Sequence, residues 1–492
     1  MNHFTKSKYL VSLTYGLIIV YFMKLIVSTL YTGGRWDLNE QIAFGERFVH
    51  GLTSYANGIN DLYFPSSPYF PGVGYLSAFL QYLGLDNLYY NNQFMLIIAV
   101  TIGVSYFFLL RKITRKLYPS VPNIIITSIL ILFFTTHFRA YIGYMIEFKP
   151  DTILLVLSSI IFLIIEKNKK INLLDIGIIA LLLFIGTFFK QSFFLMYFLT
   201  FLLVLFNIFL TKKEKISILL AYSFIGIFAL YFIFRVDNLF YFTVEAMGQH
   251  PMLNIKTIIY FFTKGFVFNI IFILALIYFI IRKYKEFSIL KAESKYFIFA
   301  FLWFVFSAIS TAKLGGNTGN FEVGLIVFTP FVIYILDILF KKLYTNQKFY
   351  QFIIAIFVII SIVYSYSLLK GIVKFINTIE ERQSSVHYLH NKFNGRYVFV
   401  DGNTYILSKE AGLTILTEAE TLGHFNNIPN YDMSHIKKAL ENQKYDLLFF
   451  QTKPIYYKDK EIEQIMDLNY FILEDEKMPK YLKNKIFIKK GK

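Results

Sequence analysis

Apolar runs of about 20 residues recur along the 492-residue chain and restrict what it can fold into. A helix of about 20 residues crosses the roughly 30 Å hydrocarbon core of a bilayer, where only helices and closed barrels satisfy their own backbone. The first run lacks a small-residue cleavage site and is too long for a signal-peptide core, so we expect it to be retained. The sequence therefore predicts a polytopic α-helical membrane protein. We place eleven spans, at approximately 9–30, 91–110, 119–136, 152–165, 172–189, 193–211, 216–234, 258–281, 296–312, 323–340 and 350–371.

The composition excludes several other classes of protein. The chain is 56% hydrophobic and 20% aromatic, with a mean hydropathy of +0.52, which leaves too little polar surface for a soluble globule. Its net charge of +17 is carried largely by lysines in short loops between apolar runs, so we expect contact with membrane lipids and none with nucleic acid. The absence of cysteine excludes disulfides and thiolate metal sites.

The distribution of basic residues predicts the orientation in the membrane. Cytoplasmic loops carry an excess of Lys and Arg, so the amino terminus is expected inside and, after an odd number of spans, the carboxyl terminus outside. The bias toward Phe, Ile, Lys and Asn suggests an AT-rich bacterial genome, and hence the cytoplasmic (inner) membrane of a bacterium. The basic residues of one side are Lys6, Lys8, Arg111, Lys112, Arg115, Lys116, Lys167, Lys169, Lys170, Lys212, Lys213, Lys215, Arg282, Lys283, Lys285, Lys291, Lys295, Lys341, Lys342 and Lys348.

The composition changes after residue 371. In 372–492, strand patterns such as RYVFVDG, YDLLFFQT, YFILEDE and KIFIKK alternate with helix patterns such as SHIKKALENQ and KEIEQIMDLN, which predicts a small α/β domain. Neither a GxGxxG nor a GxxxxGK loop is present, so no nucleotide site is expected. We predict a transmembrane catalytic domain, 1–371, followed by an extracytoplasmic domain, 372–492.

The first external loop, 31–90, carries Asp37 and Glu40 directly after the first span. The apolar residues that follow, such as Leu38 and Ile42, have helical spacing and predict an amphipathic helix in the membrane interface. Asp37 as N-cap with Glu40 three residues later would form a capping box. A general base at the membrane surface is the functional interpretation, and the two are compatible.

Other charged residues are predicted at the external ends of later spans. Glu147 and Asp151 lie beside Arg139 at the mouth of the fourth span, where Asp151 is either an N-cap or part of a polar cavity. A charge inside the apolar zone costs about 2.5–3.5 kcal/mol, which favours a functional reason for keeping one at the rim. Lys190, in GTFFKQSFF, either snorkels at a helix end or binds a phosphate.

Two further external segments are candidate parts of the site. Tyr69, Phe70 and Pro71 are interpreted as interfacial turn chemistry or as part of a re-entrant helix, and LGGNTGNFE as a flexible loop or a ligand cradle. No His or Cys cluster with ligand spacing appears, so no metal site is predicted, and a divalent metal is left open as a cofactor.

Several of these segments resemble signatures of the GT-C membrane glycosyltransferases. The run from Asp37 through Ala43, Phe48 and Gly51 to Tyr55 is similar to their first external loop, most of all in protein mannosyltransferases and lipid A aminoarabinose transferases (family 39-like). The PDT at 150–152, TFFKQS at 187–192 and GGNTGNFE resemble later signatures in the same order. In departure from the family pattern, Asp37 is followed by leucine instead of glutamate, and YFP replaces tyrosine-proline-proline.

The resemblance implies an inverting transfer of a hexose or pentose from polyprenyl phosphate to an external acceptor: surface polysaccharide, lipid A or protein. Asp37, with Glu40, would be catalytic, and Lys190 with Arg139 would bind the lipid phosphate. The residues that would orient acceptor or sugar are Glu147, Asp151, Tyr55 and Tyr69. A lipid-linked oligosaccharide polymerase or ligase, which would centre on a late arginine-containing loop, and a flippase or transporter, which would need charged or interrupted spans, remain alternatives.

Overall fold

The computed structural model describes the residues 36–51, 70–136, 148–167, 171–235, 252–313, 318–343, 347–418, 434–450 and 460–490, with scattered residues within 16–27 and 239–249. The chain divides into two compact units. The first comprises Met1–Ile26, Ala99–Tyr231 and Met252–Leu369, and the second Val27–Ile98, Phe232–Pro251 and Lys370–Lys492. The domain boundary expected after residue 371 stays a prediction.

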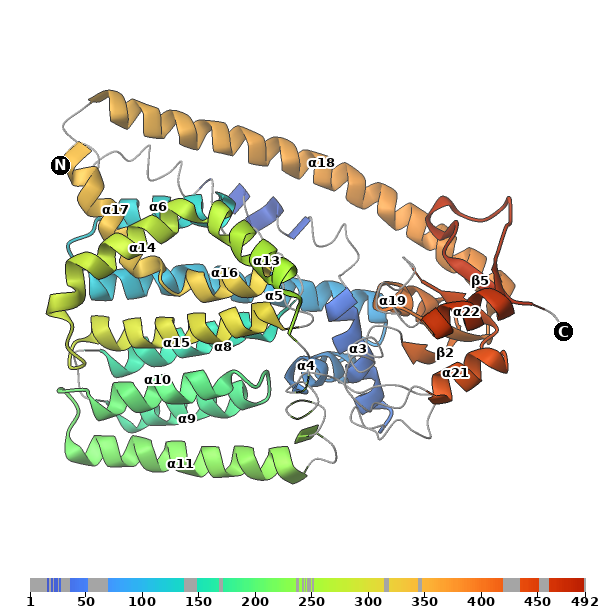
Figure 1. Cartoon of the computed structure of the whole chain (residues 1–492), viewed down its shortest axis with the longest axis horizontal. Coiled ribbons are helices and arrows are strands. Elements are labelled where there is room, and N and C mark those ends of the chain that lie inside the picture. Colours follow the sequence, from blue (N-terminus) through green and yellow to red (C-terminus); the bar gives the residue numbers. More distant parts are fainter. Residues whose placement is uncertain are drawn as a thin grey trace. The chain divides into compact units, whose positions relative to one another are not determined.

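The first unit is a layered assembly of apolar helices. In Figure 1, α8, α9, α10, α11 and α15 lie side by side, and α10 packs against α8, α9 and α15. Aromatic side chains link neighbouring helices, such as Phe184 with Phe228 and Phe162 with Tyr296. Its helices are α6 (Asn123–Thr136), α8 (Pro150–Ile165), α9 (Leu173–Thr187), α10 (Phe193–Leu205), α11 (Lys212–Arg235), α13 (Ile255–Phe268), α14 (Ile270–Lys283), α15 (Ala292–Ala312), α16 (Thr318–Ile326) and α17 (Thr329–Leu343). Two long helices, α5 (Leu88–Leu117) and α18 (Gln347–Phe393), contribute residues to both units.

The predicted spans fall on these helices. Among the described residues, α5, α11 and α15 are each long and apolar enough to cross a membrane, and two bent helix pairs bring the number to as many as five. The spans expected at 119–136, 152–165, 172–189 and 193–211 correspond to the shorter apolar helices α6, α8, α9 and α10. The span at 350–371 lies in α18, whereas most of 9–30 is outside the described residues. The total of eleven remains a prediction.

The span predicted at 323–340 is broken rather than continuous. α16 and α17 meet at an angle of 66°. Pro330 is the second residue of α17, where a proline lacks the N–H that a continuous helix would use. The span predicted at 258–281 is likewise divided at Asn269, whose side chain donates to the carbonyl of Gly265 at 2.8 Å. The length of an apolar run predicts a membrane span but does not show where the helix within it breaks.

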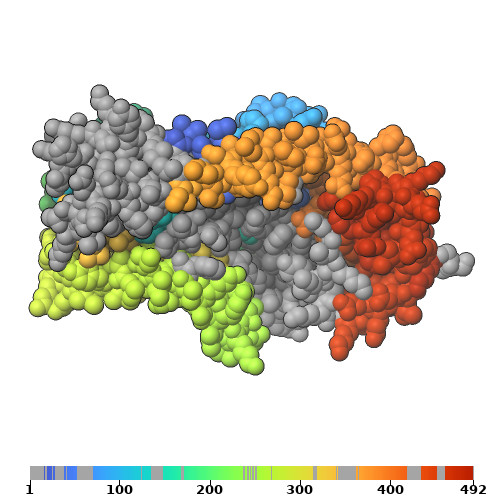
Figure 2. Space-filling model, turned by 90° about the horizontal axis from the view of Figure 1, so that it is seen from above, coloured from blue at the N-terminus to red at the C-terminus, as the bar shows by residue number. Residues whose placement is uncertain are grey.

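The outer helices present apolar side chains to their surroundings. On α11, Leu220, Phe224 and Ile227 are 66%, 74% and 68% exposed. Figure 2 shows the described residues of α18, in orange, on the surface of the molecule. Surfaces this apolar are unfavourable in water and favourable against lipid. Together with the apolar runs they define a multi-pass membrane protein.

The second unit ends in an α/β domain, as predicted. Its five described strands form one sheet in the order β2-β1-β3-β5-β4, in which β1 pairs in parallel with β2 and β3, and β5 is antiparallel to β3 and β4. Apolar faces of α21 and α22 cover it around Phe399, Leu440 and Tyr445. The elements are β1 (Tyr397–Val400), α19 (Gly402–Glu410), β2 (Thr414–Glu418), α21 (Ser434–Glu441), β3 (Leu447–Phe449), α22 (Lys460–Asn469), β4 (Tyr470–Ile472), η3 (Lys480–Leu482) and β5 (Ile486–Lys489).

Helix α3 (Trp36–Val49), from the first loop, packs in the same unit against α4 (Gly72–Tyr82) and α19. Leu38 and Ile42 are fully buried, and the polar Asn39 and Gln41 are only 2% and 5% exposed. The helix is thus confirmed, whereas its position in the membrane interface stays a prediction. Its polar side chains find protein partners, as when Asn92 donates to Asn39.

Candidate functional site

The amino end of α8 presents a buried carboxylate. Pro150 and Asp151 are the first two residues of this helix, and Asp151 is only 5% exposed. The N-cap position is held by Lys149, without a side-chain cap hydrogen bond, so Asp151 is not the N-cap that one interpretation of the sequence expected. Within the first helical turn its negative charge is favoured by the helix dipole.

Lys190 and Ser192 meet this carboxylate from the turn between α9 and α10. The Lys190 Nζ donates to Asp151 Oδ2 at 2.6 Å, and the Ser192 Oγ donates to Oδ1 at 3.4 Å. The turn follows α9, which ends at Thr187, and precedes α10, which begins at Phe193. Two sequence-predicted residues, 39 positions apart, are therefore in direct contact.

The surroundings of this cluster restrict its chemistry. The side chains of Lys190 and Asp151 are 17% and 7% exposed, so the ammonium is held by a buried carboxylate rather than extended into water as a snorkelling lysine would be. An ammonium group has three N–H donors, and the ion pair uses one of them. The cluster can therefore hold a lysine in a fixed direction while leaving donors for an anionic group.

The remaining predicted site residues are placed less completely. Asp37 is the second residue of α3, and Glu40 follows in the same helix, but the side chains of both lie outside the described residues. A capping box would require Asp37 just before the helix, and α3 already includes it. Four further predicted residues, Arg139, Glu147, Tyr55 and Tyr69, lie outside the described residues. Within the described part of the chain, no group of three His, Cys, Asp or Glu side chains could hold a metal ion.

Two polar groups that anchor α3 and α4 were missed from sequence. Ser77 donates to Asn91 at 3.0 Å, while Asn92 reaches Asn39, and all four residues are buried. Glu46, from the other end of α3, accepts from Tyr405 at 2.6 Å in the same unit. The signal was the amide run NNQ at 91–93, at the start of an apolar span, where polar side chains need partners.

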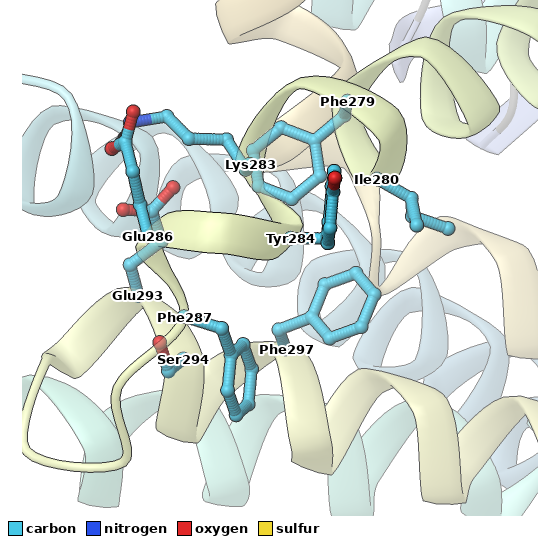
Figure 3. A pocket seen from close by; sticks show the side chains of 9 residues that line it. All are labelled: Phe279, Ile280, Lys283, Tyr284, Glu286, Phe287, Glu293, Ser294 and Phe297. Carbon is cyan, nitrogen blue, oxygen red and sulfur yellow. Dashed lines mark hydrogen bonds and ion pairs between the residues drawn. The ribbon is translucent and has the colours of Figure 1, made fainter.

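A cavity of about 250 Å³ lies at the opposite end of the first unit. Figure 3 shows the side chains that line it. α8 extends from Asp151 to its C-cap, Glu166, which pairs with Lys295 in the first turn of α15; fifteen residues of helix span roughly 23 Å. The charged groups around the cavity already have partners: Lys283 pairs with Glu286 at 2.6 Å, and Glu293 accepts from the hydroxyl of Tyr118 at 2.7 Å. Its remaining lining is largely aromatic, so we assign it no chemistry.

The fold and this geometry define a multi-pass membrane protein with a buried Asp–Lys–Ser cluster at one end of its helices and an α/β domain after them. Comparisons with protein-family models and with curated protein sequences gave no match. Solved structures did match. ArnT from Cupriavidus metallidurans bound to undecaprenyl phosphate has a TM-score of 0.57 at 10% identity, with 98% of both chains covered. The apo state of the same protein has a TM-score of 0.56 at 11% identity, covering 96% of this chain and 97% of that one.

This likeness runs through both the membrane helices and the carboxyl-terminal domain. The chain therefore has the fold of these ArnT structures.

Proposed function

We propose that this protein is an inverting membrane glycosyltransferase that takes a hexose or pentose from a polyprenyl-phosphate donor. The observation that carries the proposal is the likeness over 98% of both chains to ArnT bound to undecaprenyl phosphate. Its acceptor is a surface polysaccharide, lipid A or a protein, on the extracytoplasmic side of the bacterial cytoplasmic membrane. The amino terminus is cytoplasmic and the α/β domain extracytoplasmic.

The proposed reaction is a displacement at the anomeric carbon. An acceptor hydroxyl oxygen attacks C1 of the sugar, the bond from C1 to the phosphate oxygen breaks, and the polyprenyl phosphate leaves with the electron pair. Asp37, assisted by Glu40, takes the proton of the acceptor hydroxyl. Attack on the face opposite the phosphate inverts the configuration at C1.

Lys190 is proposed to stabilise the charge that develops on the departing phosphate, with Arg139 as its partner in this role. The contact with Asp151 at 2.6 Å supports a refined assignment, in which Asp151 is a positioning residue that directs the lysine. Preorganised donors of this kind stabilise a transition state because they need no reorientation during the reaction. Glu147, Tyr55 and Tyr69 are proposed to orient the sugar or the acceptor.

The general base is tested by Asp37→Asn. We expect membranes containing this variant to lose transfer from a radiolabelled polyprenyl-phosphate sugar, because the amide cannot accept the proton, while expression and membrane insertion stay normal. Transfer at the wild-type rate would contradict the assignment of Asp37.

The phosphate role is tested by Lys190→Ala. Loss of one preorganised donor is expected to lower turnover about 10²-fold. Because the same change leaves Asp151 buried without its partner, a double variant with Lys190→Met and Asp151→Asn separates the two effects. It should recover thermal stability in detergent but not activity. Recovery of transfer together with stability would show that the pair is structural only.

A further inference from the structure

A second hollow, of about 260 Å³, lies entirely within the second unit. It is formed where the amino end of α5, the carboxyl-terminal part of α18 and the end of α19 come together. Asn87, Tyr89, Tyr90 and Gln93 line it from the α5 side, Arg382 from α18 and Glu410 from α19. Neither the transfer reaction proposed above nor the packing of α3 uses any of these side chains.

Gln93 is the feature that points to a ligand. The residue is 9% exposed, and neither its amide nitrogen nor its amide oxygen has a hydrogen-bond partner among the described residues. A buried amide without partners has lost its hydrogen bonds to water and gained none in return, so such groups are rare in native structures. A ligand that offers both a donor and an acceptor would satisfy it, and hydroxyl groups offer both.

The charges of the hollow indicate that this ligand is neutral. The guanidinium carbon of Arg382 lies 3.8 Å from the centre of the Tyr89 ring, and the same group forms an ion pair with Glu410. Burial raises the pKa of the Glu410 carboxyl above its ordinary value, and the Arg382 charge partly offsets that effect. Because the cation is already neutralised and stacked, it attracts a phosphate or carboxylate only weakly, yet both groups can hydrogen-bond hydroxyls at the rim.

The size and the aromatic lining of the hollow restrict the class of ligand further. The volume of about 260 Å³ lies below the roughly 300–1,000 Å³ of sites for drug-sized ligands, so it suits one small ring. Tyr90 is 61% exposed at the opening and meets Tyr89 edge to face, with ring centres 5.6 Å apart. An exposed ring beside buried amide groups offers an apolar face and polar contacts to the same molecule, which matches a pyranose with its two kinds of surface.

We propose that this hollow binds one sugar residue of a neutral saccharide, with Gln93 as its central hydrogen-bonding group. Treating that saccharide as the acceptor rests on the proposed function, whereas its binding does not. A neutral glycan acceptor would thereby be favoured over a phosphorylated lipid headgroup.

Saturation-transfer NMR on the full chain, purified in a detergent without sugar headgroups, tests the binding directly. The probes are methyl α-glucoside, methyl α-galactoside, methyl α-mannoside and N-acetylglucosamine. We expect an NMR saturation-transfer signal, and hence binding, for at least one of these sugars. Its affinity should fall roughly ten-fold or more in Gln93→Leu because the hydrogen bonds are lost. Gln464→Leu, at an exposed position of α22, is the matched control and should bind as the wild type does.

Three outcomes would overturn the proposal: no NMR signal of binding for any probe, equal binding in Gln93→Leu and wild type, or displacement of the sugar by inorganic phosphate, which would indicate an anion site. Should Gln93→Leu fail to fold, Tyr90→Ala at the exposed opening gives the same decision. A chain that binds sugar but lacks transferase activity would refute the proposed function and leave the binding site standing. A chain that has transferase activity but binds none of the probes would refute the binding site and leave the proposed function standing.

Discussion

At the scale of single residues, the contact between Lys190 and Asp151 shows what a buried charge requires. Each side chain is less than one-fifth exposed, and removal of one partner from such a pair typically costs about 3–5 kcal/mol because the other charge stays buried. Ser192 adds a third polar group to the same carboxylate. A kinetic effect at Lys190 is therefore interpretable only beside a measurement of stability.

The ion pair of Asp475 should make the stability of the protein depend on pH. Its carboxylate accepts from Lys392 at 2.5 Å and from Tyr388 at 2.7 Å, and these hydrogen bonds, that of Lys392 first, hold its pKa well below the ordinary 3.8. A carboxyl whose pKa is lowered in the folded state stabilises the protein at pH values above its ordinary pKa. That stability is lost as the pH falls through the native pKa. Asp475→Asn should therefore lower the melting temperature at pH 7, and the difference from wild type should shrink below about pH 4.

The check is thermal unfolding of the purified protein in detergent at both pH values, with the exposed neighbour Glu476→Gln as the control variant. If the difference in melting temperature between wild type and Asp475→Asn grew on acidification, the lowered pKa of Asp475 could not be its cause.

At the scale of elements, α3 is held by close backbone approach on one side and by ionic contacts on the other. A Cβ atom added at Gly45 would lie 2.8 Å from the carbonyl oxygen of Gly74 in α4 and 2.7 Å from the side chain of Ser77. Glu46, the next residue, binds Lys409 at 2.9 Å and Tyr405 at 2.6 Å in α19. The helix that carries Asp37 is thus positioned by the α/β domain as well as by the first loop.

Gly45→Ala should force α3 and α4 apart and destabilise the protein by about 1–3 kcal/mol, the usual cost of overpacking. Gly177→Ala is the matched control, because no atom lies within 4 Å of the added Cβ in α9, and alanine favours a helix. Melting temperatures in detergent compare the two variants. Equal melting temperatures would mean that the approach of α3 to α4 carries no stability.

At the scale of the whole molecule, the proposed external reaction depends on the orientation of the chain in the membrane. The chain contains no cysteine, so a single introduced thiol reports one position. Lys213→Cys, exposed at the start of α11, should react with a membrane-impermeant maleimide only after the cells are opened. Lys444→Cys, exposed in the α/β domain, should react in intact spheroplasts. The reverse labelling pattern would contradict the predicted topology and the proposed external reaction.

Much of the architecture was predictable because it depends on local patterns. Apolar length predicted the helices of the first unit, and the alternation of strand and helix patterns predicted the domain that contains β1, α21, β3, α22 and β5. The break between α16 and α17 was not predicted, because helix length says nothing about an angle of 66°. Nor was the packing of α3 against α19, since 359 residues separate Glu46 from Tyr405.

The sequence by itself determined that this chain is a membrane protein with apolar helices and a terminal α/β domain, and it singled out Asp151 and Lys190 as separate candidates. Only the tertiary structure decided that these two side chains touch, and that Gln93, Arg382 and Glu410 line one hollow. The reason is physical: periodicity reports which face of an element is apolar, whereas partners distant in sequence are chosen by packing and by the need to pair buried polar groups.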